Sequence, residues 1–187
     1  MAKASLAKIE AHCNQLLRLR GINDYDGALN GLQVENHGAV TRIAAAVDAS
    51  LVTARLAAAN GANLLVVHHG LFWSQRQPWT GSNYQLMRFL FDNDLAVYSA
   101  HLPLDIHPRL GNNAQLCRAL RFRSLRPFFF EKKQFIGLQT KTSIDRDERS
   151  LGDAVCEVAR PDHFPGNIGE IDDLAGAVPA HETSSML

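Results

Sequence analysis

The sequence predicts an α/β fold, in which a mostly parallel sheet is flanked by helices and a second α/β half is incomplete. Short apolar runs such as 64–67 alternate with longer segments of helical periodicity, which is typical of βαβ units. The chain has 187 residues and 46% hydrophobic content, enough to bury a sizeable core in one domain or slightly more. Past Arg160 both periodicities vanish, because prolines and glycines interrupt a short acidic tail.

Apolar spacing and end signals define each element in turn. The first helix carries apolar residues at the three- and four-residue spacing of one helical face, and Gly21 ends it. Ser50 is suited to cap the second helix, which Asn60 and Gly61 close. In chain order, the expected elements are a helix over 5–20, a strand over 43–47, a helix over 51–59, a strand over 64–67, a helix over 83–91, a strand over 95–98 and a helix over 113–120.

The net charge of zero is divided unevenly along the chain. The first 160 residues hold 19 basic and 14 acidic residues, a charge of +5, and the last 27 carry −5. Scattered bases at this charge are compatible with a phosphorylated small molecule, but they lack the basic stripe of a nucleic-acid-binding protein. Nucleic acid is therefore not an expected partner.

The sequence also limits the compartment and the use of cysteine. No apolar run approaches the ~20 residues that span a bilayer, and the first residues lack the apolar stretch of a signal peptide. We therefore expect a soluble, cytoplasmic protein without membrane contact. Cys13, Cys117 and Cys156 are odd in number and far apart, which argues against a disulfide framework and against a thiolate zinc site.

Three histidines and a carboxylate follow two of the expected strands. His68 and His69 come directly after the run 64–67, and His101 and Asp105 come after the next strand. The carboxyl ends of parallel strands meet at one sheet edge, where ligands bind in open α/β sheets. Imidazole and carboxylate groups are common ligands of zinc, iron, manganese and nickel. The pattern predicts a divalent metal site, whose ion these ligands do not identify.

Each of these residues also has an ordinary structural interpretation. Adjacent side chains of a continuing strand point to opposite faces, so His68 and His69 share one site only if the chain turns there, which Gly70 permits. His37 and His107 read as surface turn residues. Two tryptophans, Trp73 and Trp79, either line a pocket for a flat ring or pack a long loop. Asp48 falls at the end of a third strand, at the same expected edge.

Three extended motifs carry a family resemblance. The segments 30–35, 66–73 and 101–115 resemble the type 2 GTP cyclohydrolase I homologues, also called the Ngg-interacting-factor-three-like family, in the right order between residues 5 and 158. The resemblance implies an α/β fold that assembles into a homohexameric ring, with metal sites facing an internal cavity.

The resemblance also implies roles for four residues. His68, His69 and Asp105 would be ligands of a dinuclear metal centre, and His101 would be a ligand or a catalytic proton carrier beside it. The family completes this centre with a C-terminal His-x-x-x-Glu motif, which this sequence does not contain. Either a frameshift or premature stop has replaced the later segment, or a shortened member ends in a surface tail.

We therefore expect a metal-site α/β layer over 1–120, the start of a second α/β layer over 121–160 and an irregular acidic tail over 161–187. The leading hypothesis is a metal-dependent hydrolase whose activated water attacks a nucleotide-like substrate at a cyclic C–N bond or a phosphoester, with activity impaired by the missing ligands. The alternatives are a metal-binding oligomeric scaffold without turnover and an inactive product of truncation.

Overall fold

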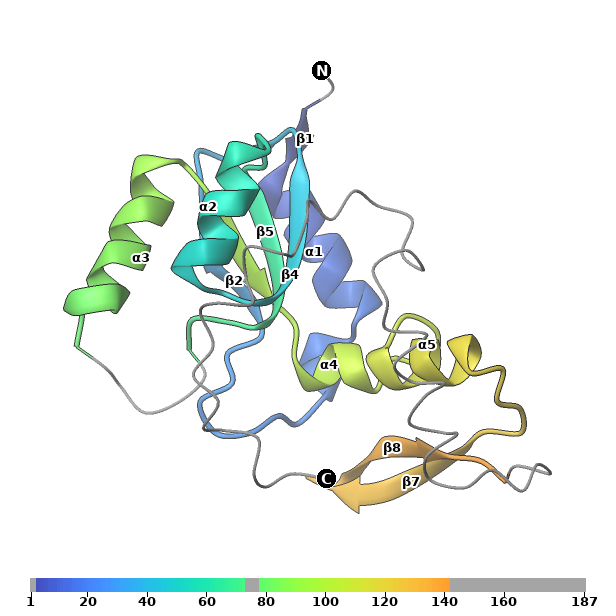
Figure 1. Ribbon diagram of the computed structural model, residues 1–187. Coiled ribbons are helices and arrows are strands. Elements are labelled where there is room, and N and C mark those ends of the chain that lie inside the picture. Colours follow the sequence, from blue (N-terminus) through green and yellow to red (C-terminus); the bar gives the residue numbers. More distant parts are fainter. Residues whose placement is uncertain (1–2, 73–77, 142–187) are drawn as a thin grey trace. The chain divides into compact units, whose positions relative to one another are not determined.

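The computed structural model describes residues 3–72 and 78–141, all within one compact unit, Met1–Thr142. A four-stranded sheet forms its centre, in the order β2 (Gly31–Val34), β6 (Ala96–Ser99), β5 (Leu64–His69) and β4 (Ile43–Asp48) (Figure 1). The β4–β5 and β5–β6 pairs are parallel, and β2 joins the edge of β6 antiparallel. The predicted mostly parallel sheet is confirmed.

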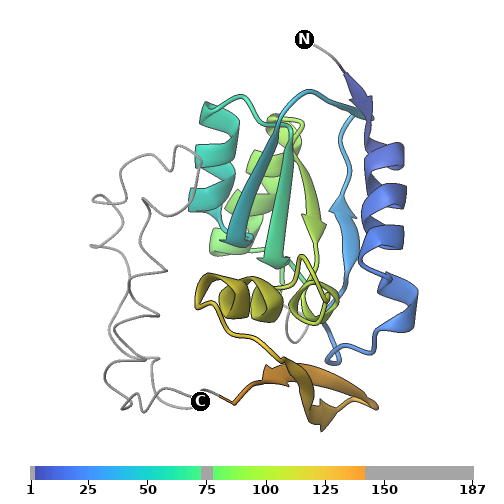
Figure 2. The ribbon, with the colours of Figure 1, turned by 90° about the vertical axis from the view of Figure 1, so that its right-hand side faces the viewer.

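Helices cover both faces of this sheet. α2 (Leu51–Ala59) and α3 (Gly81–Asp92) lie on one face, and α1 (Leu6–Leu16) lies on the other (Figure 2). Alternate residues of a strand point to opposite faces, so Leu65 and Val67 of β5 enter the core under α2 and α3, while Leu64 enters the core under α1. A strand buried on both faces reads as a continuous apolar run, which explains why the run 64–67 predicts a strand.

Several predicted boundaries shift by a few residues. Ser50 caps α2 as expected, and a capping box with Thr53 completes the cap. The first helix ends at Leu16 and gives way to a 3₁₀ turn, η1 (Leu19–Gly21), so it is shorter than predicted. The expectation that Pro103 keeps residues 101–105 from being helical is wrong. Pro103 lies in the first turn of α4 (Leu102–Asp105), where a missing N–H costs no hydrogen bond.

Five strands were not predicted, namely β2 and the members of two antiparallel pairs. β1 (Ala4–Ser5) pairs with β3 (Ala39–Val40), and β7 (Arg126–Glu131) forms a hairpin with β8 (Gln134–Gln139). Two residues, Lys132 and Lys133, connect β7 and β8, both with positive φ of 52° and 64°. This is the backbone of a type I′ turn, which usually carries Asn or Gly, so the sequence contains no turn signal there.

The remaining helix, α5 (Asn112–Ala119), connects α4 to the β7–β8 hairpin. The Asn113 amide of α5 donates to the Ile136 carbonyl at 2.8 Å. Across 3–72 and 78–141, no helix is long and apolar enough to cross a membrane. The expected boundary at 160/161 lies outside the described residues.

Candidate metal site

His68, His69 and His101 gather at the carboxyl edge of the central sheet. His68 and His69 are the last residues of β5, and His101 follows β6 immediately before α4. The ring centroid of His68 lies 4.7 Å from those of both His69 and His101. One ligand nitrogen from each ring lies within 4.8 Å of the other two. The parallel pairing of β5 and β6 therefore brings imidazoles from two separate strand ends together.

The two adjacent histidines share this site although β5 does not turn before them. The strand continues through His69, which pairs in register with Asp48 of β4. The His68 Nδ1 lies 3.1 Å from the Ala100 carbonyl oxygen, while the His69 Nδ1 lies 2.8 Å from the Asp48 carboxylate. Each ring thus turns toward a different neighbouring strand. The expectation that a turn at Gly70 was needed is wrong.

Asp24 holds the third ring from a loop that precedes β2. Its Oδ1 lies 2.8 Å from the His101 Nδ1, and its Oδ2 accepts bonds from the Asn30 amide at 2.7 Å and the Leu102 N–H at 3.1 Å. The side chains of His101 and Asp24 are only 10% and 6% exposed. Burial alone would raise the Asp24 pKa, but the hydrogen bonds from Asn30, His101 and the Tyr25 N–H together lower it. Asp24 is therefore ionised at neutral pH.

Asp105 approaches the cluster from α4. Its Oδ2 lies 3.5 Å from the His68 Nε2, and its Oδ1 accepts a 2.7 Å bond from the Asn112 amide. Two ligands of one tetrahedral zinc ion, each at roughly 2.1 Å from the metal, lie about 3.4 Å apart. The separation of His68 and Asp105 matches that of two groups that bind the same ion.

The hydrogen bonds of the three rings define their chemistry. Carbonyl and carboxylate oxygens only accept, so each Nδ1 carries a proton and the neutral ring has its lone pair on Nε2. Burial lowers the pKa of His68 despite the nearby Asp105, which favours the neutral ring that binds metals. Metal-binding histidines in proteins generally donate their other N–H in this way. The donor set therefore fits a divalent ion.

Two glycines allow the chain to pack tightly around these residues. A Cβ at Gly111 would lie 2.4 to 2.6 Å from the main-chain oxygens of Leu104, Asp105 and His107. A Cβ at Gly70 would lie 2.3 Å from the Gln33 amide, which accepts a 2.6 Å bond from the Leu71 N–H. Glycine at 111 lets α5 begin against the turn that carries Asp105.

Part of this site has little signal in the sequence. The strand pattern predicts Asp48 at the sheet edge, whereas Asp24 and Asn30 lie in a stretch without helical or strand periodicity. The one signal for Asn30 is that it begins the motif over 30–35. His107 is buried at 9% exposure and accepts two main-chain N–H bonds, so its surface assignment is wrong. His37 is exposed, as predicted.

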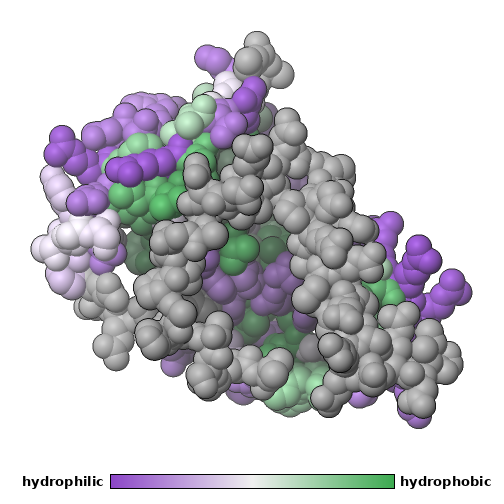
Figure 3. Space-filling model, viewed as in Figure 1, coloured by the Kyte–Doolittle hydropathy of each residue, from purple (hydrophilic) through white to green (hydrophobic). Residues whose placement is uncertain are grey.

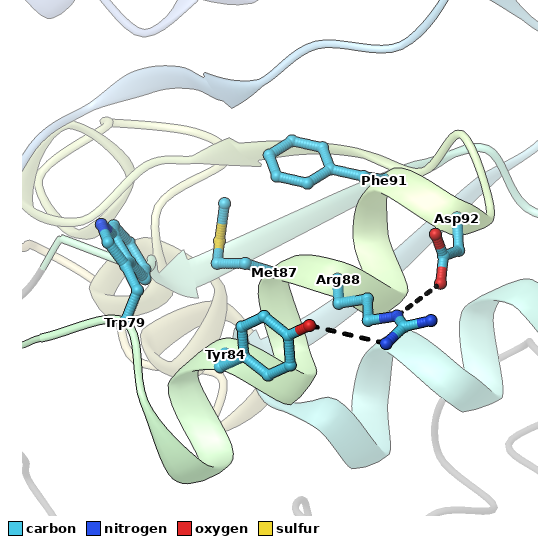
Figure 4. Close-up of a pocket in the computed structure, with 6 residues that line it drawn as sticks. All are labelled: Trp79, Tyr84, Met87, Arg88, Phe91 and Asp92. Carbon is cyan, nitrogen blue, oxygen red and sulfur yellow. Dashed lines mark hydrogen bonds and ion pairs between the residues drawn. The ribbon is translucent and has the colours of Figure 1, made fainter.

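A separate pocket lies beside α3 (Figure 4). It encloses about 580 Å³, and the Arg88–Asp92 ion pair borders its apolar surface. Its lining residues are Trp79, Tyr84, Met87, Arg88, Phe91 and Asp92. Trp79 therefore does line a pocket, but none of the histidines of the sheet edge contributes to it. Trp73 lies outside the described residues.

Comparisons with known proteins agree with the motifs. Residues 4–178 match the Duf34/NIF3 (NGG1p interacting factor 3) family, so the match extends past residue 158 into the tail. A "GTP cyclohydrolase 1 type 2 homolog" of Deinococcus radiodurans is 50% identical over 103 residues, 55% of this chain and 39% of the relative. The homolog of Treponema pallidum is 43% identical over 132 residues, 70% of this chain and 46% of the relative.

A solved structure, TTHA1606 from Thermus thermophilus, shares the fold. Its TM-score is 0.64 at 37% identity, and the alignment covers 67% of this chain and 51% of that one. The chain thus spans about half the length of the relatives it matches.

Proposed function

This chain belongs to the Duf34/NIF3 (NGG1p interacting factor 3) family, and from that premise we propose that it is a metal-dependent hydrolase of nucleotide-like substrates. One observation carries the proposal. Three imidazoles converge at the sheet edge, and an oxygen acceptor engages the Nδ1 of each one. Three rings oriented together, with Nδ1 engaged and Nε2 as the basic atom, have the arrangement that metal-binding histidines generally adopt.

Some of these residues would bind the metal ion, and others orient the histidine rings. His68, His69 and Asp105 would hold a divalent ion, and a bound ion would supply Lewis-acid chemistry and activate water at neutral pH. Asp48 and Asp24 orient the His69 and His101 rings through their Nδ1 atoms. Because Asp24 occupies its Nδ1, His101 presents Nε2 to the site, where it would either bind the ion or carry a proton.

The substrate class follows from charge and from the names of the relatives. The +5 charge of the first 160 residues favours an anionic substrate, and several relatives carry the name of a GTP cyclohydrolase homolog. A phosphorylated nucleotide fits both. The reaction would be hydrolysis of a cyclic C–N bond or of a phosphoester.

A second function is compatible with the same donors. The sequence holds no His-x-x-x-Glu motif, which the family resemblance implies for a complete dinuclear centre. A metal-binding, homo-oligomeric scaffold without turnover would need only the donors present. Both functions require the metal, and only the hydrolase requires turnover.

Metal binding and turnover can be measured on the same protein. We expect the purified chain to bind Zn²⁺ or Mn²⁺ in titrations and the His68→Ala, His69→Ala double variant to lose that binding. With metal bound, GTP and a phosphodiester substrate are then assayed for hydrolysis that Asp105→Ala abolishes. Undiminished metal binding by the double variant would exclude the site, and binding without turnover would favour the scaffold.

His101→Ala separates its two roles. If His101 carries a proton, the variant keeps its metal affinity and loses turnover. If His101 is a ligand, metal affinity itself falls.

A further inference from the structure

We propose that the tip of the β7–β8 hairpin is a positioning device for His101, acting through the loop that carries Asp24. This inference rests on the proposed function, because it assigns the hairpin to the same metal site. The hairpin tip comprises Glu131, Lys132, Lys133 and Gln134. More than a hundred residues separate it in sequence from the loop that it contacts.

The first contacts are to Asn23, the residue before Asp24. The Gln134 amide donates to the Asn23 carbonyl at 2.6 Å and accepts from the Asn23 N–H at 3.3 Å. One carboxamide thereby bonds both main-chain groups of Asn23, as a neighbouring strand would. The Asn23 side chain in turn donates to the Lys132 carbonyl at 3.1 Å.

The second contacts are to Tyr25, the residue after Asp24. Its hydroxyl donates to Glu131 at 3.1 Å, and the Lys132 ammonium lies 4.6 Å from the centre of its ring. A cation over an aromatic face is attracted by the ring quadrupole. Tyr25 also lies near the candidate metal site, because its ring centroid is 6.1 Å from that of His101.

Asp24 lies between Asn23 and Tyr25, both of which contact the hairpin tip. Its carboxylate has to satisfy His101, Asn30 and the Leu102 N–H at once, so a small displacement of the loop would break several bonds together. The loop has no ladder partner of its own, since β2 begins only at Gly31. The hairpin tip therefore supplies the support that secondary structure does not give to this loop.

The hairpin is built to hold its tip in place. Lys132 and Lys133 keep positive φ although neither is glycine, a conformation that persists where surrounding contacts hold it. Two residues beyond the tip, Asn113 of α5 donates to the Ile136 carbonyl of β8. The hairpin is thus fixed to α5, which itself begins beside Asp105.

The test compares the two glutamines at the ends of β8. Gln134→Ala removes the pairing with Asn23, and Gln139→Ala is the control, because the Gln139 side chain makes no hydrogen bond within the described part of the chain. Both full-length variants are titrated with Co²⁺, whose visible absorption reports binding. Long-range ¹H–¹⁵N spectra of the metal-free proteins report the protonation of each ring nitrogen.

We expect Gln134→Ala to bind Co²⁺ about 3- to 10-fold more weakly, less than the roughly 10- to 100-fold that loss of a direct partner of a metal-binding histidine costs. In the metal-free protein, the His101 ring signals should change or broaden, while those of His69 remain. The Gln139→Ala control should match the wild type in both measurements.

A second variant keeps the test decisive if Gln134→Ala does not fold. Tyr25→Phe removes one hydroxyl and should shift the same signals in the same direction. Folded variants with wild-type His101 signals would overturn the proposal. If the wild type binds no Co²⁺, the metal site is excluded, yet the ring signals of the metal-free protein still decide the role of the hairpin tip.

Discussion

Each imidazole of the candidate site is oriented by an oxygen from a different part of the chain. His68 uses the Ala100 carbonyl after β6, whereas His69 uses the Asp48 carboxylate at the end of β4. His101 uses Asp24, from a loop outside the sheet. Only the first acceptor belongs to the main chain, so the other two rings depend on side chains that a single substitution can remove.

Gly111 offers a test of how closely α4 and α5 must approach. In Gly111→Ala, the new Cβ would meet three main-chain oxygens at 2.4 to 2.6 Å, so the turn that carries Asp105 has to move. We expect a loss of roughly 1–3 kcal/mol in the free energy of unfolding, as for other overpacked sites, together with weaker metal binding. Urea denaturation and metal titration measure the two effects.

Gly21→Ala is the matched control, because a Cβ at Gly21 meets no atom within 4 Å. Its free energy of unfolding should stay within about 0.5 kcal/mol of the wild type. Equal stability of both variants would mean that the α4–α5 contact tolerates a methyl group.

At the scale of elements, α1 is fastened to the sheet by a buried phenol. Tyr98 of β6 is 2% exposed, and its hydroxyl donates to the Asn14 side chain of α1 at 3.0 Å. Burial strongly raises the Tyr98 pKa, since a phenolate in the core would lose its hydration. The neutral phenol is thus the form that the folded chain requires.

This gives Tyr98 a predictable effect on stability at alkaline pH. A raised pKa in the folded state means that the stabilisation is complete below the unfolded pKa of about 10 and is lost as the pH rises above it. Tyr98→Phe should cost roughly 0.5–1.5 kcal/mol near neutrality through the lost hydrogen bond. Above about pH 10, denaturant midpoints of the wild type should fall more steeply with pH than those of the variant. Parallel curves would contradict this.

The elements that the sequence predicted are those with a local signal. β5 is a continuous apolar run, and Ser50 caps α2 with its own side chain. The hairpin was not predicted because Lys132 and Lys133 are not typical turn residues. The turn is instead supported by contacts of Lys132 with Asn23 and Tyr25. Tertiary contacts of this kind leave no periodicity in the sequence.

The candidate site also contains residues that only tertiary contacts bring together. His68 and His69 could be placed at a sheet edge because strand ends follow from periodicity. Asp24 could not, because its loop precedes the sheet in sequence and lies beside His101 only through tertiary structure. Its role depends on a separation of 77 residues along the chain.

For the whole molecule, the sheet has an exposed edge that suggests a surface for assembly. β4 is an outer strand, and Ile43 and Val47 on it are 53% and 62% exposed. Val52 and Leu56 of the adjacent α2 are also exposed, and Figure 3 shows hydrophobic surface in the region of that helix. Unpaired edge strands with apolar side chains tend to pair with another chain.

We therefore expect the chain to self-associate, and Val47→Lys to reduce that association. A charge on an edge strand opposes edge-to-edge pairing, so light scattering should give a lower mass for the variant at equal concentration. Leu116→Lys is the control, since Leu116 is an exposed apolar residue of α5, away from β4 in the sequence. A monodisperse wild-type monomer would exclude β4 as an association edge.

The number of metal ions bound per chain tests whether its donors form one metal site or a dinuclear centre. His68, His69, His101 and Asp105 amount to four donors, enough for one four-coordinate ion, whereas two ions about 3.5–4 Å apart share a larger set. We expect elemental analysis to find at most about one tightly bound divalent ion per chain. Removal of that ion by a chelator should lower the melting temperature, because an ion that binds only the folded state stabilises it.

The longer relatives provide the complementary experiment. The family resemblance implies a His-x-x-x-Glu motif in the part of those proteins that this chain does not span. Appending the C-terminal half of the Deinococcus radiodurans relative should therefore raise the stoichiometry toward two ions and raise turnover with it. Each ~1.4 kcal/mol of added transition-state stabilisation gives a tenfold faster rate, so even a few kcal/mol would separate the fusion from the parent chain. Rapid turnover by the parent chain, abolished by Asp105→Ala, would instead show that the donors described here are sufficient.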